Sequence, residues 1–505
     1  MRIAVIGAGI SGIVAAHYMV KSGHQVTVYE KSGELGGVWA LGYPDVRLQN
    51  TGQHYRLSDI PWKSPPDRHP TSGQIRQYLN EAVQTLGLEI KLGHEVVALE
   101  ERENGWGLTY SSADGRGSAD FDFAIVSIGQ YSEGKHQPRF EGQESFRGEI
   151  ITEREVEGLD IFNDKRVLVA GFGKSALDMA TFAVERAREV HHVFRTPRWM
   201  IPFYMLGIHY THFMFCRMGT VVMPSWVQPN KFERFLHQKL AFLVRANWNF
   251  IAAIARTQNF FRGLGRSEKA RAGLAAVIPR HHIIGDLRSA AAMAPQMYLK
   301  YVADEKLFPC HGEIASFTEE GVQLKNGDRI ACDLAVLSLG SSSPRFPFMP
   351  EKYRQILEKE NDGVQLYRHL LHPRIPNMAF AGFNHGFMHV PAAEVGMLWL
   401  SAYLEGDLEL PSAEEMEKSI GRVLQWKREH IHFEPSRSCA VNTRFQQYID
   451  IMLQDLGLSP YRKLPNVFAE IFSQYGAADY TGIYEEYQVS RNKLKLPLKV
   501  CALDT

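Results

Sequence analysis

The sequence predicts an α/β fold with two nested parallel-sheet units, a largely helical insertion and a helical C-terminal tail. The first observation is a repeated order of apolar strand, glycine-rich turn and helix, at residues 3–22 and again at 166–188. The second is helix-type patterning over most of 390–490. The third is length, because 505 residues exceed what one hydrophobic core supports. We therefore expect two or three domains.

The expected boundaries follow from these units. The first unit takes residues 1–161. The second takes 162–340 and contains an aromatic-rich helical insertion at about 199–280. Residues 341–505 complete the first unit and add the C-terminal helices. Inside the first unit we also predict a helix at 72–86 and short strands at 94–100, 106–111 and 121–127.

Composition excludes several classes of protein. Lys plus Arg equals Asp plus Glu, 56 of each, so the chain lacks the basic footprint of a nucleic-acid-binding protein and any general attraction to an anionic membrane. None of the five Cys forms a CxxC pair, which speaks against a disulfide framework, a zinc site and a dithiol redox centre. Because residues 1–3 already begin a strand, we expect no signal peptide and a cytoplasmic protein.

The first glycine turn has the pattern of a Rossmann-like dinucleotide site. Gly7, Gly9 and Gly12 form GxGxxG, which allows a tight turn, a close approach to a pyrophosphate and close packing of helix on strand. Glu30 ends the next strand, where an acid suits a ribose with free hydroxyls, as in FAD or NAD. A second glycine pair in 33–39, "GELGGVW", is typical of a flavin site.

The second turn predicts a different nucleotide. Gly171 and Gly173 are kept, and Ala176 takes the third position. Arg195 stands where the first unit has its acid, so it could pair with a 2′-phosphate and favours NADPH over NADH. Lys174 could reinforce this choice.

Together the turns predict a chain that holds FAD and NADPH at once, with hydride passing from NADPH to the flavin. A disulfide acceptor is disfavoured because CxxC is missing, which leaves oxygen or a quinone. Buried strands that run into glycine add Gly129, Gly340 and Gly382 to the candidates. The predicted cofactor-binding residues are Gly7, Gly9, Gly12, Glu30, Lys31, Gly37, Val38, Trp39, Val96, Gly129, Gly171, Gly173, Lys174, Ser175, Arg195, Gly340 and Gly382.

The insertion is the least ordinary part of the sequence. Residues 199–216 carry no formal charge, but Pro202 and the short length argue against a membrane span. Residues 231–262 repeat apolar residues at helical spacing, and we expect an amphipathic helix that packs on its own protein. The alternatives are a wall of a substrate tunnel or a contact with a membrane surface, which we do not favour.

Several motifs in order resemble the flavin-containing monooxygenase family: the first turn, "GGVW", "GFGKSA", "FRTPRW", "NMAFAGF", "AAEVGMLWLSAYLEGDLELPS" and "LGLSPYRK". The resemblance covers nearly the whole chain and is greatest to the plant branch that includes the pathogen-induced pipecolate N-hydroxylase. The family fingerprint FxGxxxHxxx(Y/F) is only half present in 146–156, because Thr152 replaces the His and Val156 the aromatic residue. The resemblance therefore leaves the gating of NADPH binding in doubt.

The resemblance implies a chemistry and a set of partners. Reduced FAD would react with O2 to give a C4a-hydroperoxide, from which a small-molecule soft nucleophile takes one oxygen atom. N-oxygenation of an amine or amino acid-like compound is the first expectation; S-oxygenation, Baeyer–Villiger oxygenation and a non-oxygenating NADPH–flavin reductase are alternatives. Asn50 is the candidate catalytic residue, with an ordinary turn role equally open, and His385 and His389 are candidate contacts. No metal is expected, and a homodimer is left open.

Overall fold

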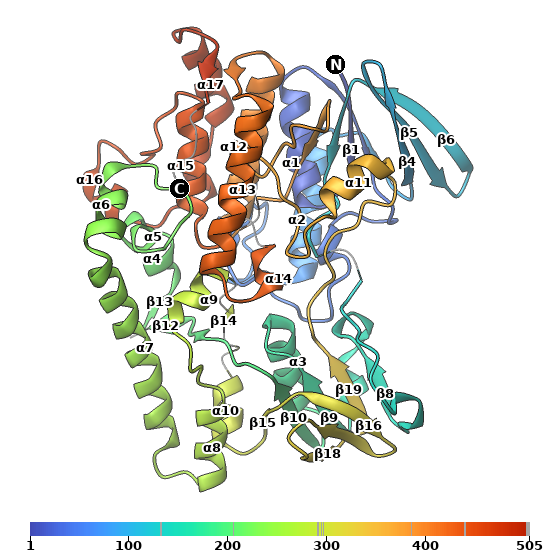
Figure 1. The fold of residues 1–505 in the computed structure, drawn as a ribbon, viewed down its shortest axis with the longest axis vertical. Helices are drawn as coiled ribbons and strands as arrows, with labels where there is room; N and C mark the ends of the chain where they lie inside the picture. Colours follow the sequence, from blue (N-terminus) through green and yellow to red (C-terminus); the bar gives the residue numbers. More distant parts are fainter. Residues whose placement is uncertain are drawn as a thin grey trace.

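The structure is a computed structural model that describes residues 1–500 except 132, 133, 206, 290, 291, 294, 296, 385, 439 and 440. It is a mixed α/β protein with two five-stranded parallel sheets (Figure 1). The first sheet, in the order β20-β7-β1-β2-β3, is formed by β1 Arg2–Ile6, β2 Gln25–Tyr29, β3 Ile90–Lys91, β7 Phe123–Val126 and β20 Met378–Phe380.

Each face of the first sheet is covered by a different layer. Ile3 and Val5 point to one side and pack with the helices, whereas Ala4 and Ile6 point to the other, as the two-residue period of a strand requires. The helical side holds α1 Ile10–Lys21, α2 Ser72–Leu86 and α12 His389–Leu404. The opposite side holds α11 Glu351–Leu357 and an antiparallel meander of β4 Glu95–Arg102, β5 Gly105–Ser112 and β6 Gly115–Phe121.

The second sheet repeats this plan. Its order is β15-β10-β9-β19-β8, with β8 Glu149–Ile151, β9 Arg166–Ala170, β10 Glu189–Phe194, β15 Phe308–His311 and β19 Leu334–Leu337. One face packs on α3 Lys174–Val184 and α10 Tyr298–Ala303. The other packs on a meander of β16 Ile314–Thr318, β17 Gly321–Leu324 and β18 Arg329–Ala331.

The insertion leaves the second unit after β10 and reaches the first. Its short strands are β11 Met200–Ile201, β12 Tyr204–Met205, β13 Ile208–His209 and β14 Ala292–Met293. Its helices are α4 Thr211–Met214, α5 Arg217–Val221, α6 Lys231–Lys239, α7 Ala241–Gly263, α8 Glu268–Ala276 and α9 Ile283–Ser289. Trp199, Trp226 and Trp248 from the insertion are buried in the same core as α1 and α12.

The C-terminal region is helical, as predicted. It contains β21 Leu408–Glu409, α13 Ala413–His430, α14 Glu434–Arg437, α15 Phe445–Asp455, α16 Val467–Phe472, α17 Ile483–Arg491 and β22 Leu498–Lys499. The predicted helix at 231–262 is instead two helices, because Leu240 leaves helical geometry (φ −115°, ψ 27°) and packs against the core.

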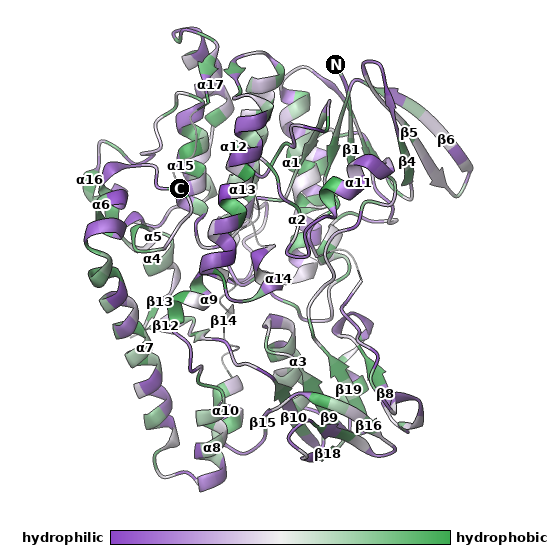
Figure 2. Ribbon diagram, in the orientation of Figure 1, coloured by the Kyte–Doolittle hydropathy of each residue, from purple (hydrophilic) through white to green (hydrophobic). Residues whose placement is uncertain are grey.

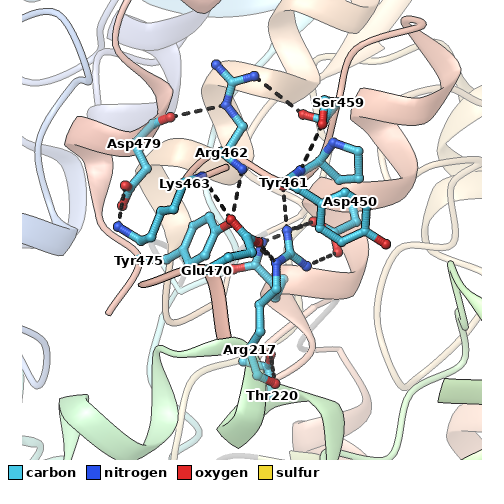
Figure 3. A network of polar contacts seen from close by, with 12 residues as sticks. Arg217, Thr220, Asp450, Ser459, Tyr461, Arg462, Lys463, Glu470, Tyr475 and Asp479 are labelled. Atoms are coloured by element: carbon cyan, nitrogen blue, oxygen red, sulfur yellow. Dashed lines mark hydrogen bonds and ion pairs between the residues drawn. The ribbon is translucent and has the colours of Figure 1, made fainter. Parts of the chain in front are cut away.

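A buried polar cluster joins the insertion to the C-terminal helices (Figure 3). Arg217 on α5 donates to Asp450 on α15 through two nitrogens, at 2.6 and 3.2 Å, and also pairs with Glu470 on α16. The hydroxyl of Tyr475 donates to Glu470 and accepts from the backbone of Arg462. Arg217 is thus the centre of a clamp between the two regions.

Candidate active site

The first glycine turn needs glycine for three separate reasons. Gly7 has φ +107°, and a Cβ there would lie 2.4 Å from the carbonyl oxygen of Ser127. A Cβ on Gly12 would lie 1.9 Å from the oxygen of Gly7, so α1 could not rest on β1. Gly37 approaches Gly9 so closely that a Cβ on Gly37 would lie 3.2 Å from the Cα of Gly9. A side chain is therefore excluded at Gly7 by the backbone conformation, at Gly12 by the packing of α1 on β1, and at Gly37 by the close approach of two backbone segments.

The start of α1 is open to an anion. No described side chain caps Gly9, the residue before α1. The first backbone N–H groups of a helix have no partner within it, and the helix dipole places partial positive charge there. This arrangement suits a pyrophosphate.

A distant segment closes over this turn. A Cβ on Gly382, which has φ +88°, would lie 2.6 Å from Oγ of Ser11. His389, the first residue of α12, has its Nε2 2.9 Å from the same Oγ. Burial lowers the pKa of His389 to about 4, so its ring is neutral near pH 7. His385 lies outside the described residues.

The acid at the end of β2 is buried and already held. Oε2 of Glu30 accepts the Ala8 N–H at 2.7 Å, and Oε1 accepts from the Ser32 backbone and hydroxyl at 2.9 and 3.0 Å. A carboxylate offers about four acceptor positions, so Oε2 keeps one for a ribose hydroxyl. Lys31 is exposed next to it, and Val96, on β4 of the meander, is buried in the core between the meander and the first sheet.

The second turn repeats the first with small changes. Gly171 has φ +121°, and its Cβ would lie 2.2 Å from the oxygen of Ser338, the counterpart of Ser127. A Cβ on Gly173 would meet no heavy atom within 4 Å, and no described side chain caps α3. Gly340 and Gly129, with φ +97° and +77°, follow the corresponding strands β19 and β7.

A hydrogen-bonded histidine supports the second turn from below. Nε2 of His192 lies 2.6 Å from the carbonyl oxygen of Gly171, and Nδ1 lies 2.6 Å from the Tyr298 hydroxyl on α10. Burial lowers the pKa of His192 to about 4. The neutral ring therefore donates from Nε2 to the carbonyl and accepts from Tyr298 at Nδ1. Sequence reasoning missed this pair, since nothing local links residues 192 and 298.

The two predicted cations of the second unit differ. Arg195 is exposed at the end of β10, and no described residue accepts a hydrogen bond from its guanidinium. Lys174 is instead paired with Asp178, which also accepts the Tyr43 hydroxyl at 2.8 Å. Of these two cations, Arg195 is therefore the better placed to bind an external anion.

A cavity of about 1300 Å³ joins the two units. Of the predicted residues, it is lined by Val38, Trp39, Asn50, Gly171, Gly173, Lys174, Ser175, Arg195 and Gly340. The others, Gly7, Gly9, Gly12, Glu30, Lys31, Gly37, Val96, Gly129 and Gly382, lie outside its lining. Predicted contacts to both nucleotides thus meet in one space.

The end of the cavity near Asn50 is almost free of charge. Among the described residues of 38–55, 386–387 and 442 that line it, Arg47 is the one charged residue. The Asn50 amide donates to the carbonyl of Phe387, and Nε1 of Trp39 donates to the Tyr55 hydroxyl at 2.7 Å. Phe387, from the loop that follows Gly382, and Asn442 reach this wall from far along the chain, and sequence reasoning missed Asn442.

The half-missing fingerprint has a structural replacement. Residues 149–151 form β8, the edge strand of the second sheet. Thr152 caps the short 3-10 turn at 153–155 together with Glu155, to which its hydroxyl donates at 2.8 Å. Val156 is buried in the core of the second unit. Thr152 and Val156 therefore hold the linker as structural residues.

Known proteins resemble this chain in sequence and in fold. Residues 4–203 match the family described as pyridine nucleotide-disulphide oxidoreductase. A probable flavin-containing monooxygenase 1 of Arabidopsis thaliana is 29% identical, over 95% of this chain and 96% of that protein.

Solved structures show the same fold. An open form of cyclohexanone monooxygenase has a TM-score of 0.68 at 17% identity and covers 90% of this chain and 97% of that one. S-allyl-L-cysteine S-oxygenase from Allium sativum has a TM-score of 0.60 at 18% identity, with 98% and 99% covered.

These proteins match the chain across both glycine-turn units, not only across the first. Over more than nine tenths of its length, the chain is thus similar to proteins named flavin-containing monooxygenases.

Proposed function

We propose that this protein transfers one oxygen atom from O2 to the nitrogen of a small amine or amino acid-like substrate, using FAD and NADPH. One observation carries the proposal: a single cavity joins both nucleotide units and ends in a wall nearly without charge. A reaction that relied on a protein acid or base would need such a group at this end. An oxidant made on a cofactor needs mainly positioning and exclusion of water.

The FAD site lies, in this proposal, on the first unit, which residues 1–161 and 341–505 form together. The residues fit the group. The pyrophosphate would meet the uncapped start of α1, and Gly9 and Gly37 leave the backbone bare where it must approach. Glu30 keeps one acceptor position for a ribose hydroxyl.

The NADPH site lies, in this proposal, on residues 162–340. The cavity wall carries an excess of cations that suits a polyanionic nucleotide: Arg47, Lys135, Arg154, Lys174, Arg195, Arg198 and Arg437 against Glu153, Glu313 and Glu434. The uncapped start of α3 would hold the pyrophosphate. Arg195 would pair with the 2′-phosphate, which gives the preference for NADPH over NADH.

When bound, FAD accepts hydride from NADPH and activates O2 for transfer of one oxygen atom. The chain's own part is to hold and shield the reactants. The amide of Asn50 is fixed by the Phe387 carbonyl, and its own backbone carbonyl accepts from Nδ1 of His69 at 2.9 Å. Asn50 is thus a rigid polar group on a wall that also carries aromatic side chains.

Nitrogen is preferred to sulfur or a ketone because of that wall. Trp39, Tyr55 and Phe387 present aromatic rings, which attract the protonated form of an amine as it enters, and amide groups there can orient a polar substrate. The resemblance to the plant branch points in the same direction. S-oxygenation, Baeyer–Villiger oxygenation and a reductase without oxygen transfer remain the competing functions.

Isotopically labelled O2 separates these possibilities. The holoenzyme is supplied with NADPH and a panel of amines, amino acids, thioethers and ketones, and products are analysed by mass spectrometry. We expect one labelled oxygen on nitrogen and NADPH consumption in proportion to product. Label on sulfur or carbon alone would shift the assignment, and peroxide without labelled product for any substrate would contradict oxygen transfer.

A further inference from the structure

The outer edge of the insertion exposes large apolar side chains. Nine phenylalanines are exposed among the described residues, all of them on α4, α6, α7 and α16: Phe213, Phe232, Phe235, Phe242, Phe250, Phe260, Phe261, Phe468 and Phe472. Most exceed half of full exposure, and Phe468 reaches 73%. Exposed apolar side chains that gather on neighbouring helices, rather than standing singly over the surface, indicate a binding face. Residues 231–262 do pack on the protein through Val244, Trp248 and Ala252, but of the apolar residues on which the prediction rested, Phe232, Phe235 and Leu243 are exposed.

The longest helix has a clean division of faces. At about 100° per residue, Phe242, Leu243, Phe250, Phe260 and Phe261 fall within one arc of about 100° on α7. The other α7 residues within this arc are Ala246, Ala253 and Thr257, so it contains no charge. Val244, Trp248 and Ala252 lie on the opposite side and are buried. Because of the helical period, these phenylalanines lie on the side of α7 that faces away from the protein.

A second helix extends the same edge. Val467 and Phe468 on α16 are 59% and 73% exposed. The α16 helix contacts α5, to which the Arg217 clamp holds it, and His237 of α6 binds the Val221 carbonyl of α5 at 2.8 Å. Figures 1 and 2 show α16, α6 and α7 along one edge of the molecule, with hydrophobic and hydrophilic residues interspersed on α7. We call the exposed side of these three helices the phenylalanine face.

The charge around this face has one sign. Residues 231–264 contain six cations, Lys231, Arg234, Lys239, Arg245, Arg256 and Arg262, and one acid, Glu233, which is buried. The whole chain is neutral, so this imbalance is local. A symmetric dimer through the same face would bring cations against cations. A surface with apolar depth and negative charge complements it better.

We propose that the phenylalanine face docks the protein on an anionic membrane surface. The aromatic side chains would enter the boundary between headgroups and acyl chains, while the flanking cations meet lipid phosphates. The helices would lie along the surface. No helix among the described residues is long and apolar enough to cross a bilayer.

Vesicle co-sedimentation of the FAD-loaded protein tests this proposal. Vesicles of phosphatidylcholine alone are compared with vesicles that also contain phosphatidylserine. We expect binding to the anionic vesicles that weakens as salt is raised. The triple variant Phe250→Ser, Phe260→Ser and Phe261→Ser should bind at least about tenfold more weakly, because three apolar anchors are lost.

The matched control is Val489→Ser on α17, which removes a side chain that is 58% exposed away from this face. It should bind as the unchanged protein does. Consumption of NADPH should be the same in all three proteins, since none of the changed residues lines the cavity. Equal binding of the triple variant would overturn the proposal. So would failure to bind anionic vesicles together with self-association, measured by ultracentrifugation, that the triple variant abolishes.

Discussion

The two glycine-turn units have the same strand–turn–helix arrangement but differ in the charged residue that follows their second strand. In each, a central strand ends in a turn whose first glycine has positive φ and lies against a serine carbonyl, Ser127 in one and Ser338 in the other. In the first unit the acid Glu30 is buried and hydrogen-bonded before any ligand arrives. In the second, Arg195 is exposed on an open cavity. The difference is what our proposal requires, with a tightly held FAD on the first unit and an exchanging NADPH on the second.

The largest loss of stability should come from breaking the Arg217 contacts between the insertion and the C-terminal helices. Arg217→Ala would leave Asp450 and Glu470 buried without their cation, at a cost of about 3–5 kcal/mol. Thermal unfolding should show a clear drop in stability. The control Arg266→Ala removes an exposed partner of Asp304 and should cost less than about 1 kcal/mol. Equal effects of both changes would contradict the role of the clamp.

A matched pair of glycine substitutions should weaken FAD binding and NADPH binding separately. Neither Gly9→Ala nor Gly173→Ala strains the backbone, with φ of −71° and −87°, and neither Cβ clashes, so both variants should fold. The added methyl group would stand where a pyrophosphate must approach. We expect Gly9→Ala to lose most of its flavin absorbance.

Gly173→Ala should stay yellow but require about a hundredfold more NADPH for reduction, a loss of about 2.7 kcal/mol. Each variant serves as the folding control of the other. Normal flavin content in Gly9→Ala, or loss of flavin in Gly173→Ala, would reverse the assignment of the two turns.

Arg195→Ala tests whether the cation at the end of β10 selects NADPH over NADH. Loss of a charge-assisted pair with a 2′-phosphate costs about 1.5–3 kcal/mol, so KM for NADPH should rise about tenfold to hundredfold. KM for NADH should hardly move, because NADH lacks that phosphate. An equal rise for both nucleotides would remove the 2′-phosphate role.

The smallest effect concerns a feature that the two turns share. His389 beside the first turn and His192 beneath the second both have a pKa of about 4, below the ordinary 6.5. Between pH 6.5 and 4 the unfolded chain therefore binds protons that the folded one does not, and stability falls as pH falls. Either His192→Gln or His389→Gln should flatten this slope by up to about 1.4 kcal/mol per pH unit. Unchanged pH dependence of the unfolding midpoint would show that these rings do not titrate as stated.

Sequence predicted the elements whose signals are local. The helix at 72–86 coincides with α2, because Thr71 and Gln74 form a capping box and Gly87 ends the helix in left-handed geometry. The strand β6 was not predicted, since its sequence, "GRGSADF", is mostly polar and exposed. The roles of the predicted cofactor residues stay predictions, although the structure gathers half of them around one cavity.

Long-range contacts were beyond that reasoning. The Tyr298–His192 pair and the wall formed by Phe387 and Asn442 join residues that no spacing rule relates. The phenylalanine face was missed for a different reason: helical spacing shows that a helix has an apolar side, but not what covers it.

The positions of the edge strands in the sequence also decide when each sheet can be completed during synthesis. The edge strand of the second sheet, β8, precedes its partner β19, whereas β20 of the first sheet follows its partner β7 by about 250 residues. At about 5–20 residues per second, a ribosome needs roughly 10 to 50 seconds to supply it. During that time β7 presents an unpaired edge, the kind of surface that invites wrong pairing. The order of synthesis therefore completes the first sheet after the second, although β1 is made before any strand of the second sheet.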